Sequence, residues 1–380
     1  MADRPAPLVV MAGPDPAEPP FGSYAAVIAS GRHLLAAELS QRLGRAGAAV
    51  ASIPVSSRAE SFHWGRWFAA GAREVLAAAT GPLDAIGWAG AGAVSLLPDA
   101  GLDDLLSPVA GEVVANNRYS ADAFVVAGDL DAALTVIEAV ESDNAVPRAL
   151  EAAGFALRDL GAHPFSRFDV DTPQDLALLR LATRLPGTRP INPALAAFLD
   201  GVQLPGGRGL EIPRLDEVLG VLRNREAELF VAGRVPSATF AHLEREAACR
   251  VRLLVEERGM RAAAGHRPQS VLTSLLADHG AAGLIVALAD FGQAAVLDSR
   301  VLMAAVAGSS LATAWPPAEE RYAADFGDAA RSGTGWLGEV TAAAGSSPIP
   351  ILMGGHALVS DGLRILTDVA WQGRPQMSIP

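Results

Sequence analysis

Two aspartates near the middle of the chain have the type and spacing of a metal site. Asp169 and Asp171 lie in the segment Phe168-Asp-Val-Asp-Thr-Pro-Gln-Asp-Leu176. Alternate residues of a strand share a face, so the two carboxylates are predicted to lie together at a strand end and to bind Mg²⁺. Thr172 and Pro173 suit the N-cap and the first position of a following helix. An aspartate before a helix is also a common cap, and a solvated strand end is the alternative.

A second polar cluster stands in Ala115-Asn-Asn-Arg-Tyr-Ser-Ala-Asp122, just before an apolar run. Polar groups that follow a strand of an open α/β sheet lie at its carboxyl edge, where such sheets bind ligands. We therefore predict that Asn116, Asn117 and Arg118 contact a nucleotide and that Asp122 is a further catalytic carboxylate facing Asp171. The alternative is that the paired asparagines only form a turn.

A glycine pair in Gly90-Ala-Gly-Ala-Val-Ser95 partly matches the loop that binds dinucleotides. The third glycine of that pattern is Ser95, and no acidic residue ends a following strand at the expected distance. A tight turn from strand to helix explains the pair equally well. Backbone N–H groups of Gly90 and Gly92 are still candidates for contact with a bound nucleotide.

The second half of the chain has polar residues directly after several predicted strands. If the strands are parallel, these residues share one edge of the sheet and form a pocket for a polar ligand. The candidates are Gly233, Glu257, Asp298, Gly355 and His356. A histidine in a loop is also commonly a structural residue, so His356 alone is weak evidence.

The elements that must position these residues alternate between strand and helix. Apolar runs typical of buried strands and segments with helical spacing follow one another in both halves. The pattern predicts an α/β protein of two domains, each a mainly parallel sheet with helices on both faces, the second a Rossmann-like doubly wound sheet. The predicted strands are 7–12, 48–55, 83–88, 111–115, 123–126, 228–232, 250–255, 284–287, 294–297 and 349–353.

Two proline- and glycine-rich stretches interrupt this pattern, Leu185–Pro193 and Leu204–Gly209. Three prolines in nine residues do not continue a helix. The sequence therefore predicts a first domain over residues 1–185, a linker over 186–209 with one bridging helix at 194–201, and a second domain over 210–380.

The segment Ser142–Leu181 resembles the C-terminal end of the molybdenum-cofactor and phospholactate guanylyltransferase group. The match is most specific in Phe168–Leu176, which is similar to that group's D-[IV]-D-T-P-x-D-L ending. The resemblance covers roughly residues 1–185. It implies a nucleotide-diphospho-sugar-transferase-like fold and Mg²⁺-dependent nucleotidyl transfer, with Asp171 and Asp169 as metal ligands.

The chain also departs from that group. The family's first loop is rich in glycine and carries arginine and lysine, whereas the loop from Gly13 to Ser23 here is rich in proline, and the chain has no lysine. The family's aspartate at the end of a central strand is missing from Ile86–Ser95. Gly13, Ser23 and arginines such as Arg32, Arg58 and Arg118 are left as phosphate contacts. Two hypotheses follow: a nucleotidyltransferase-like protein acting on a nucleotide or phosphorylated small molecule, or a non-catalytic ligand-binding or scaffold protein of the same fold.

The composition limits the classes of partner that we expect the chain to bind. The net charge is −12, with 14 arginines against 22 acidic residues before position 190 and 16 against 20 after it, so neither half offers a basic face for nucleic acid. The N-terminal residues do not have the pattern of a signal peptide, and no long uncharged apolar window predicts a membrane span. The single cysteine, Cys249, excludes an internal disulfide. We expect a cytoplasmic protein, and the sequence leaves its oligomeric state open.

Overall fold

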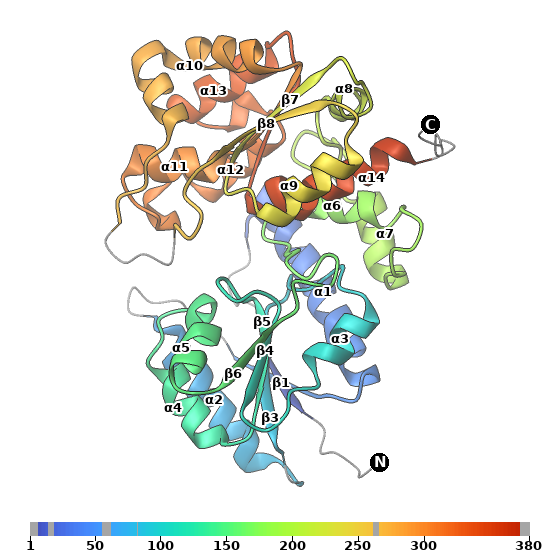
Figure 1. Ribbon diagram of the computed structural model, residues 1–380, viewed down its shortest axis with the longest axis vertical. Helices are drawn as coiled ribbons and strands as arrows, with labels where there is room; N and C mark the ends of the chain where they lie inside the picture. Colours follow the sequence, from blue (N-terminus) through green and yellow to red (C-terminus); the bar gives the residue numbers. More distant parts are fainter. Residues whose placement is uncertain (1–6, 14–18, 55–61, 82, 261–265, 373–380) are drawn as a thin grey trace. The chain divides into compact units, whose positions relative to one another are not determined.

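The computed structural model describes residues 7–13, 19–54, 62–81, 83–260 and 266–372 and has an α/β fold (Figure 1). The chain divides into two compact units, each containing one sheet. Unit 1 comprises Met1–Pro20, Ala29–Asp171 and Arg189–Ala197, and unit 2 comprises Phe21–Ile28, Thr172–Thr188 and Phe198–Pro380. The predicted fold class of two sheets covered by helices is confirmed.

Unit 1 has a six-stranded sheet in the order β2-β1-β3-β5-β4-β6. All neighbouring strands are parallel except that β5 is antiparallel to both β3 and β4. The connection from β4 to β5 is only seven residues long, too short for the crossover that a parallel pair needs, so the chain turns back. The strands are β1 (Leu8–Ala12), β2 (Ala49–Ile53), β3 (Ala85–Ala89), β4 (Glu112–Ala115), β5 (Ala123–Ala127) and β6 (Ala156–Asp159).

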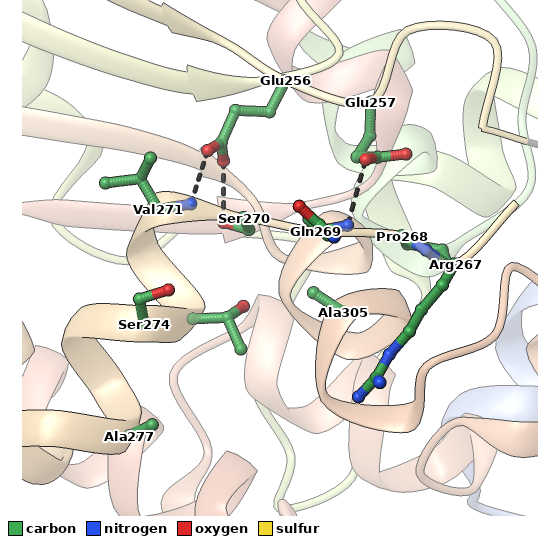
Figure 2. A pocket seen from close by; sticks show the side chains of 11 residues that line it. Glu256, Glu257, Arg267, Pro268, Gln269, Ser270, Val271, Ser274, Ala277 and Ala305 are labelled. Atoms are coloured by element: carbon green, nitrogen blue, oxygen red, sulfur yellow. Dashed lines mark hydrogen bonds between the residues drawn. The ribbon is translucent and has the colours of Figure 1, made fainter.

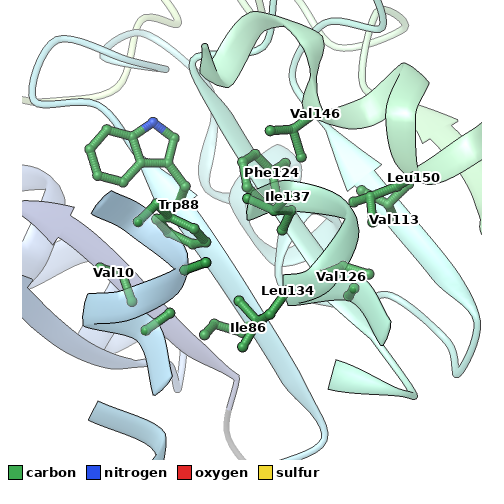
Figure 3. Close-up of a cluster of buried hydrophobic side chains, with 14 of the residues drawn as sticks. Val10, Ile86, Trp88, Val113, Phe124, Val126, Leu134, Ile137, Val146 and Leu150 are labelled. Atoms are coloured by element: carbon green, nitrogen blue, oxygen red, sulfur yellow. The ribbon is translucent and has the colours of Figure 1, made fainter. Parts of the chain in front are cut away.

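Helices cover both faces of this sheet because its strands are apolar on both sides. Val10 on β1 faces a core shared with α2, α4 and α5, in which Trp64, Phe68 and Leu134 are buried (Figure 3). Its neighbours Val9 and Met11 face the opposite core, built with α1 and α3. The helices are α1 (Tyr24–Arg45), α2 (Trp64–Ala78), α3 (Asp99–Leu105), α4 (Leu130–Glu138) and α5 (Val146–Ala152).

Unit 2 has a four-stranded sheet in the order β10-β9-β7-β8. Every pair of neighbours is parallel, as predicted. From β7 the chain first builds β8 on one side and then β9 on the other, which creates a topological switch point between β7 and β9. The strands are β7 (Glu228–Gly233), β8 (Arg250–Val255), β9 (Ala294–Asp298) and β10 (Ile351–Gly354).

Helices of unit 2 also pack on its sheet, and α10 and α13 share one core with β7 and β9. The predicted strand at 284–287 is wrong, because these residues lie within α10. Leu284 and Ile285 are buried there, and a short apolar run cannot distinguish a buried helix from a strand. The helices are α6 (Pro173–Ala182), α7 (Pro193–Gly201), α8 (Leu215–Leu222), α9 (Ser237–Glu246), α10 (Val271–Phe291), α11 (Ser299–Ala307), α12 (Ala318–Asp325), α13 (Trp336–Gly345) and α14 (Leu363–Trp371).

Helix α10 is long and apolar enough, by length and composition, to cross a membrane. The sequence had predicted no membrane span. Gly280 has φ 67° and ψ −178°, which breaks the helix into two parts of nine and eleven residues. Each part is shorter than the roughly 20 helical residues that span a bilayer, and Leu284 and Leu288 belong to the unit 2 core.

The division of the chain into two units differs from the predicted domains. Helix α6 and the residues that follow it to Thr188 belong to unit 2, although the boundary was predicted after residue 185. The predicted linker contains α7, close to its predicted range, and is shared between the two units. Helix α6 packs within unit 2 because its Gln174 side chain donates hydrogen bonds to the carbonyl oxygens of Asp325 and Met353.

Candidate functional site

The carboxyl edge of the unit 1 sheet brings Asp169, the Gly90–Gly92 turn and Asp122 together. The N–H of Val170 donates to the carbonyl oxygen of Gly92 at 3.3 Å, and the N–H of Gly90 donates to the carbonyl oxygen of Asp122 at 2.9 Å. A Cβ atom on Gly92 would lie 2.4 Å from the Val170 carbonyl oxygen and 2.8 Å from an Asp169 carboxylate oxygen. Gly92 therefore serves close packing of backbone against the Asp169 segment.

Asn116 is a buried support of this edge. Its side-chain oxygen accepts hydrogen bonds from the N–H groups of Asp122 and Ala123, each at 3.0 Å, and its amide nitrogen donates to the Ser166 carbonyl oxygen. The side chain is 1% exposed. Asn116 therefore joins the β4–β5 connection to the segment that leads to Asp169, and it positions the site without facing a ligand.

Asp171 is the most exposed carboxylate of the edge and interacts with charges on two other elements. The Arg32 guanidinium of α1 lies 3.7 Å from its carboxylate, and the two side chains are 43% and 66% exposed. Burial, and to a smaller extent the negative charge of Asp171, raise the pKa of Asp143. The Trp88 indole N–H faces the Asp143 carboxyl group and lowers that pKa, without forming a hydrogen bond of ordinary geometry.

Asp143 was missed by the sequence analysis. It begins the short 3₁₀ helix Asp143–Ala145 before α5. Its signal was weak, because a single acid in a connection between helices is ordinary. Only the fold places this carboxylate where the charge of Asp171 acts on it.

Other predicted contacts of unit 1 have structural partners. The Arg118 side chain pairs with Glu151 on α5 at 2.7 Å, and the backbone N–H of Arg118 donates to the Asp159 carboxylate. The Asn117 side chain accepts from the N–H of Tyr119 and closes a turn. Gly13 ends β1 and its N–H donates to the carbonyl oxygen of Ile53. Arg58 lies outside the described residues.

Ser23 belongs to unit 2 and caps a helix. Its hydroxyl oxygen accepts from the N–H of Ala26 in the first turn of α1. The N–H groups of Tyr24 and Ala25 donate to the Glu319 carboxylate of α12 at 3.0 and 2.8 Å. A carboxylate of the chain itself thus takes the donors that a phosphate would use at this helix N-terminus.

In unit 2 the structure brings Gly233, Asp298 and His356 to one edge. A Cβ atom on Gly233 would lie 2.3 Å from the Asp298 Cβ. Arg234 binds Asp298 through Nε at 2.6 Å and Nη2 at 3.1 Å. Asp298 and Arg234 both act electrostatically on His356. Gly355 directly precedes His356, and a Cβ atom there would contact nothing within 4 Å.

Glu257 faces a different part of unit 2, a cavity of about 630 Å³ beside the first turn of α10 (Figure 2). Its carboxylate accepts from the N–H of Gln269, while Glu256 accepts from the Ser270 hydroxyl and the Val271 N–H. Neither Gly233, Asp298, Gly355 nor His356 lines this cavity. The five predicted residues therefore fall into two groups.

Among the described residues, no three His, Cys, Asp or Glu side chains are grouped so that they could hold a metal ion. The donors of the unit 1 edge nevertheless fit one kind of Mg²⁺ binding. Mg²⁺ is commonly held by one or two carboxylates together with substrate phosphates and water. A cation bound between Asp143 and Asp171 would offset the negative charge that Asp171 exerts on Asp143.

Comparisons with known proteins give little beyond this geometry. No family model matches the chain, and no curated protein matches it. A crystal structure from Desulfovibrio desulfuricans G20, described as a "putative nucleotide-diphospho-sugar transferase", is similar to part of the chain at 12% identity and a TM-score of 0.36. The similarity covers 51% of this chain and 93% of that one. The roles of the residues in both units therefore rest on the geometry of this chain.

Proposed function

We propose that unit 1 binds a nucleotide or phosphorylated small molecule together with Mg²⁺, as a nucleotidyltransferase-like protein. The observation that carries the proposal is the exposed Asp171 carboxylate beside the Arg32 guanidinium, with Asp143 close enough for the charge of Asp171 to act on it. A carboxylate next to an arginine, with a second carboxylate nearby, suits a cation that is shared with phosphate oxygens, which the arginine can bind in turn.

In this proposal Asp171 and Asp143 hold Mg²⁺, and Asp169 and Asp122 complete the acidic edge. The bound cation would neutralise phosphate charge during transfer. Arg32 exchanges its contact with Asp171 for a phosphate oxygen. The Gly90–Gly92 turn packs its backbone directly against the Asp169 segment, which holds Asp169 at this edge. In nucleotidyl transfer an acceptor oxygen attacks the α-phosphorus, the bond to the bridging oxygen breaks, and pyrophosphate leaves.

A specific observation favours a second candidate, a binding protein without transfer activity. Arg118, which was expected to contact a phosphate, is bound to Glu151, and the first turn of α1, directly after Ser23, is bound to Glu319. The chain has no lysine to replace them. In this case unit 1 binds Mg²⁺-nucleotide and releases no pyrophosphate with any acceptor.

The first test is calorimetry of the full chain with GTP, ATP, CTP and UTP, each with and without Mg²⁺. We expect at least one nucleotide to bind only with Mg²⁺, and Asp171→Ala and Asp143→Asn each to weaken that binding tenfold or more. Asp131→Ala is the matched control, since Asp131 is an exposed aspartate after the antiparallel strand β5, at the other edge of the sheet. Unchanged affinity in Asp171→Ala would falsify the metal assignment. Release of pyrophosphate with a panel of phosphorylated acceptors distinguishes the two candidates.

A further inference from the structure

The switch point of the unit 2 sheet carries a charged cluster that the proposed function of unit 1 does not use. Gly233 ends β7 and Asp298 ends β9, the two strands that flank the switch point. Gly233 has φ +123°, and its missing side chain lets the turn lie directly on Asp298. Ligands of doubly wound sheets bind at this place in the topology.

The negative charge of Asp298 is compensated by a positive charge of the chain itself. Its side chain is fully buried and forms a two-bond pair with Arg234. Burial alone would raise the pKa of Asp298, but Arg234, then His356 and Arg300, outweigh it and hold the pKa below its usual value. The pair uses Nε and Nη2 of Arg234. Its Nη1 has no hydrogen-bond partner among the described residues, so this nitrogen can donate to a ligand.

His356 is held in one tautomer by Ser360. The Ser360 hydroxyl donates its hydrogen to the carbonyl oxygen of His356 at 2.8 Å, so its oxygen accepts from His356 Nδ1–H at 3.2 Å. Nε2 then carries the lone pair, and it has no hydrogen-bond partner in the described part of the chain. The backbone is irregular here, since Ser360 (φ −106°, ψ −113°) lies in the π-helical segment Leu358–Gly362. Such bulges are frequent at functional sites.

The charges around His356 are mainly positive. Arg234, Asp298 and Arg258, which stand at or shortly after the ends of β7, β9 and β8, act electrostatically on it. Burial, followed by the charge of Arg234, lowers the pKa of His356 to about 4, against the opposing charge of Asp298. His356 is therefore neutral at neutral pH, and an added negative charge would favour its protonated form.

We propose that Arg234 and His356, at the switch point of unit 2, bind the phosphate or carboxylate group of a small ligand, and that His356 takes up a proton when this oxyanion binds. Arg234 Nη1 and protonated Nε2 of His356 are the donors at this place, and the positive charge of Arg258, whose guanidinium donates to the carbonyl oxygen of Val235, also acts on His356. The one carboxylate there is already paired. The open side of Gly355, where a Cβ atom would contact nothing within 4 Å, leaves room for the anion. The inference concerns unit 2 alone and holds whether or not unit 1 binds a nucleotide.

The test is an NMR titration of the full chain labelled at the histidine Cε1 atoms, with the His356 signal identified among the seven histidines through His356→Gln. The titrants are potassium phosphate, potassium acetate, and potassium chloride at equal ionic strength. We expect phosphate or acetate, and not chloride, to raise the pKa of His356 by about one unit, which means tenfold tighter binding to the protonated form. The more effective titrant identifies the ligand group as phosphate or carboxylate.

Substitutions separate ligand binding from a structural role. Arg234→Gln alone would leave the buried charge of Asp298 unpaired, so it is combined with Asp298→Asn. This double variant should bind the anion at least tenfold more weakly than the unaltered protein. Asp298→Asn alone keeps the cap of α11 and frees Arg234, so it should strengthen binding several-fold. Arg252→Gln, which removes an exposed arginine paired with Glu228, is the matched control. The proposal fails if His356 responds equally to all three salts, or if the double variant binds the anion as well as the unaltered protein.

Discussion

The aspartates of this protein differ in whether an arginine side chain is paired with their carboxylate. Asp325 is buried and bound at both oxygens by Arg300, and Asp298 is bound in the same way by Arg234. Asp143 has no arginine among the groups that shift its pKa, and a second carboxylate acts on it. Residue type alone does not reveal this difference, because all these residues are aspartates near the ends of strands or helices. Asp143, with no arginine among the groups that shift its pKa, and Asp171, whose contact with Arg32 is solvent-exposed, are the carboxylates proposed to bind a cation.

Two histidines should make the stability of unit 2 sensitive to mild acid. Burial lowers the pKa of both His242 and His356 to about 4, from an ordinary value of 6.5. The unfolded chain therefore binds protons first as the pH falls, so the free energy of unfolding should decrease between about pH 6.5 and 4 and level off below. Each histidine should contribute about 1–3 kcal/mol to this decrease.

Urea denaturation at several pH values measures the effect. His242→Gln and His356→Gln should each flatten the pH dependence, whereas His33→Gln, on the exposed side of α1, should leave it unchanged. If the stability of His242→Gln and His356→Gln fell with pH as steeply as that of the unaltered protein, these histidines would not be the cause of the pH dependence.

At the scale of elements, the turn after β3 depends on a glycine that no side chain can replace. A Cβ atom on Gly92 would meet the Val170 carbonyl oxygen at 2.4 Å, and backbone cannot move aside as a flexible side chain can. Gly92→Ala should therefore destabilise unit 1 by about 1–3 kcal/mol. It should also weaken Mg²⁺-nucleotide binding, because it moves Asp169 away from the turn.

Gly44→Ala provides the control for this substitution. Gly44 is exposed near the end of α1, and a Cβ atom there meets nothing within 4 Å. Alanine should stabilise the helix by about 0.4–1 kcal/mol through the unfolded state. Thermal unfolding and calorimetry measure whether Gly92→Ala lowers the stability and Gly44→Ala raises it. If Gly92→Ala left the stability unchanged, the 169–171 segment would not be held by the turn.

The sequence predicted the positions of strands and helices better than it predicted which side chains meet in the folded protein. Apolar runs identified β1 to β5 and every strand of unit 2, and the polar residues after β4 and at the end of β9 were correctly expected at strand ends. The run Leu284–Ala287 was assigned to a strand because four apolar residues have no distinguishing period. Strand β6 was missed because it is short and only partly buried. Which carboxylates meet, such as Asp143 and Asp171, depends on long-range packing that local patterns do not encode.

At the scale of the whole molecule, the two units are not two consecutive stretches of chain. Unit 2 takes in Phe21–Ile28 and Thr172–Thr188 from before the predicted boundary. Tyr24 stacks on Phe326 and its hydroxyl donates to Asp328, and Gln174 is bound to the backbone beside β10. Proline and glycine mark breaks in local structure, but they do not show on which sheet the preceding helix packs. The prediction of a boundary after residue 185 reflects that limit.

Helix α6 should therefore be required for unit 2 to fold. Leu176, Leu178 and Leu179 are fully buried on this helix, and burial of three leucines contributes about 5–9 kcal/mol, comparable with the total stability of a domain. A fragment of residues 210–380 should then lack a cooperative urea transition, whereas a fragment of residues 172–380 should have one. Both fragments lack Phe21–Ile28, so the comparison isolates the contribution of 172–209. Replacing Leu178, which packs against Gly362, with alanine in the longer fragment should cost about 2–5 kcal/mol. Equal stability of the two fragments would mean that the predicted domain boundary is the correct one and that α6 only rests on a unit that folds without it.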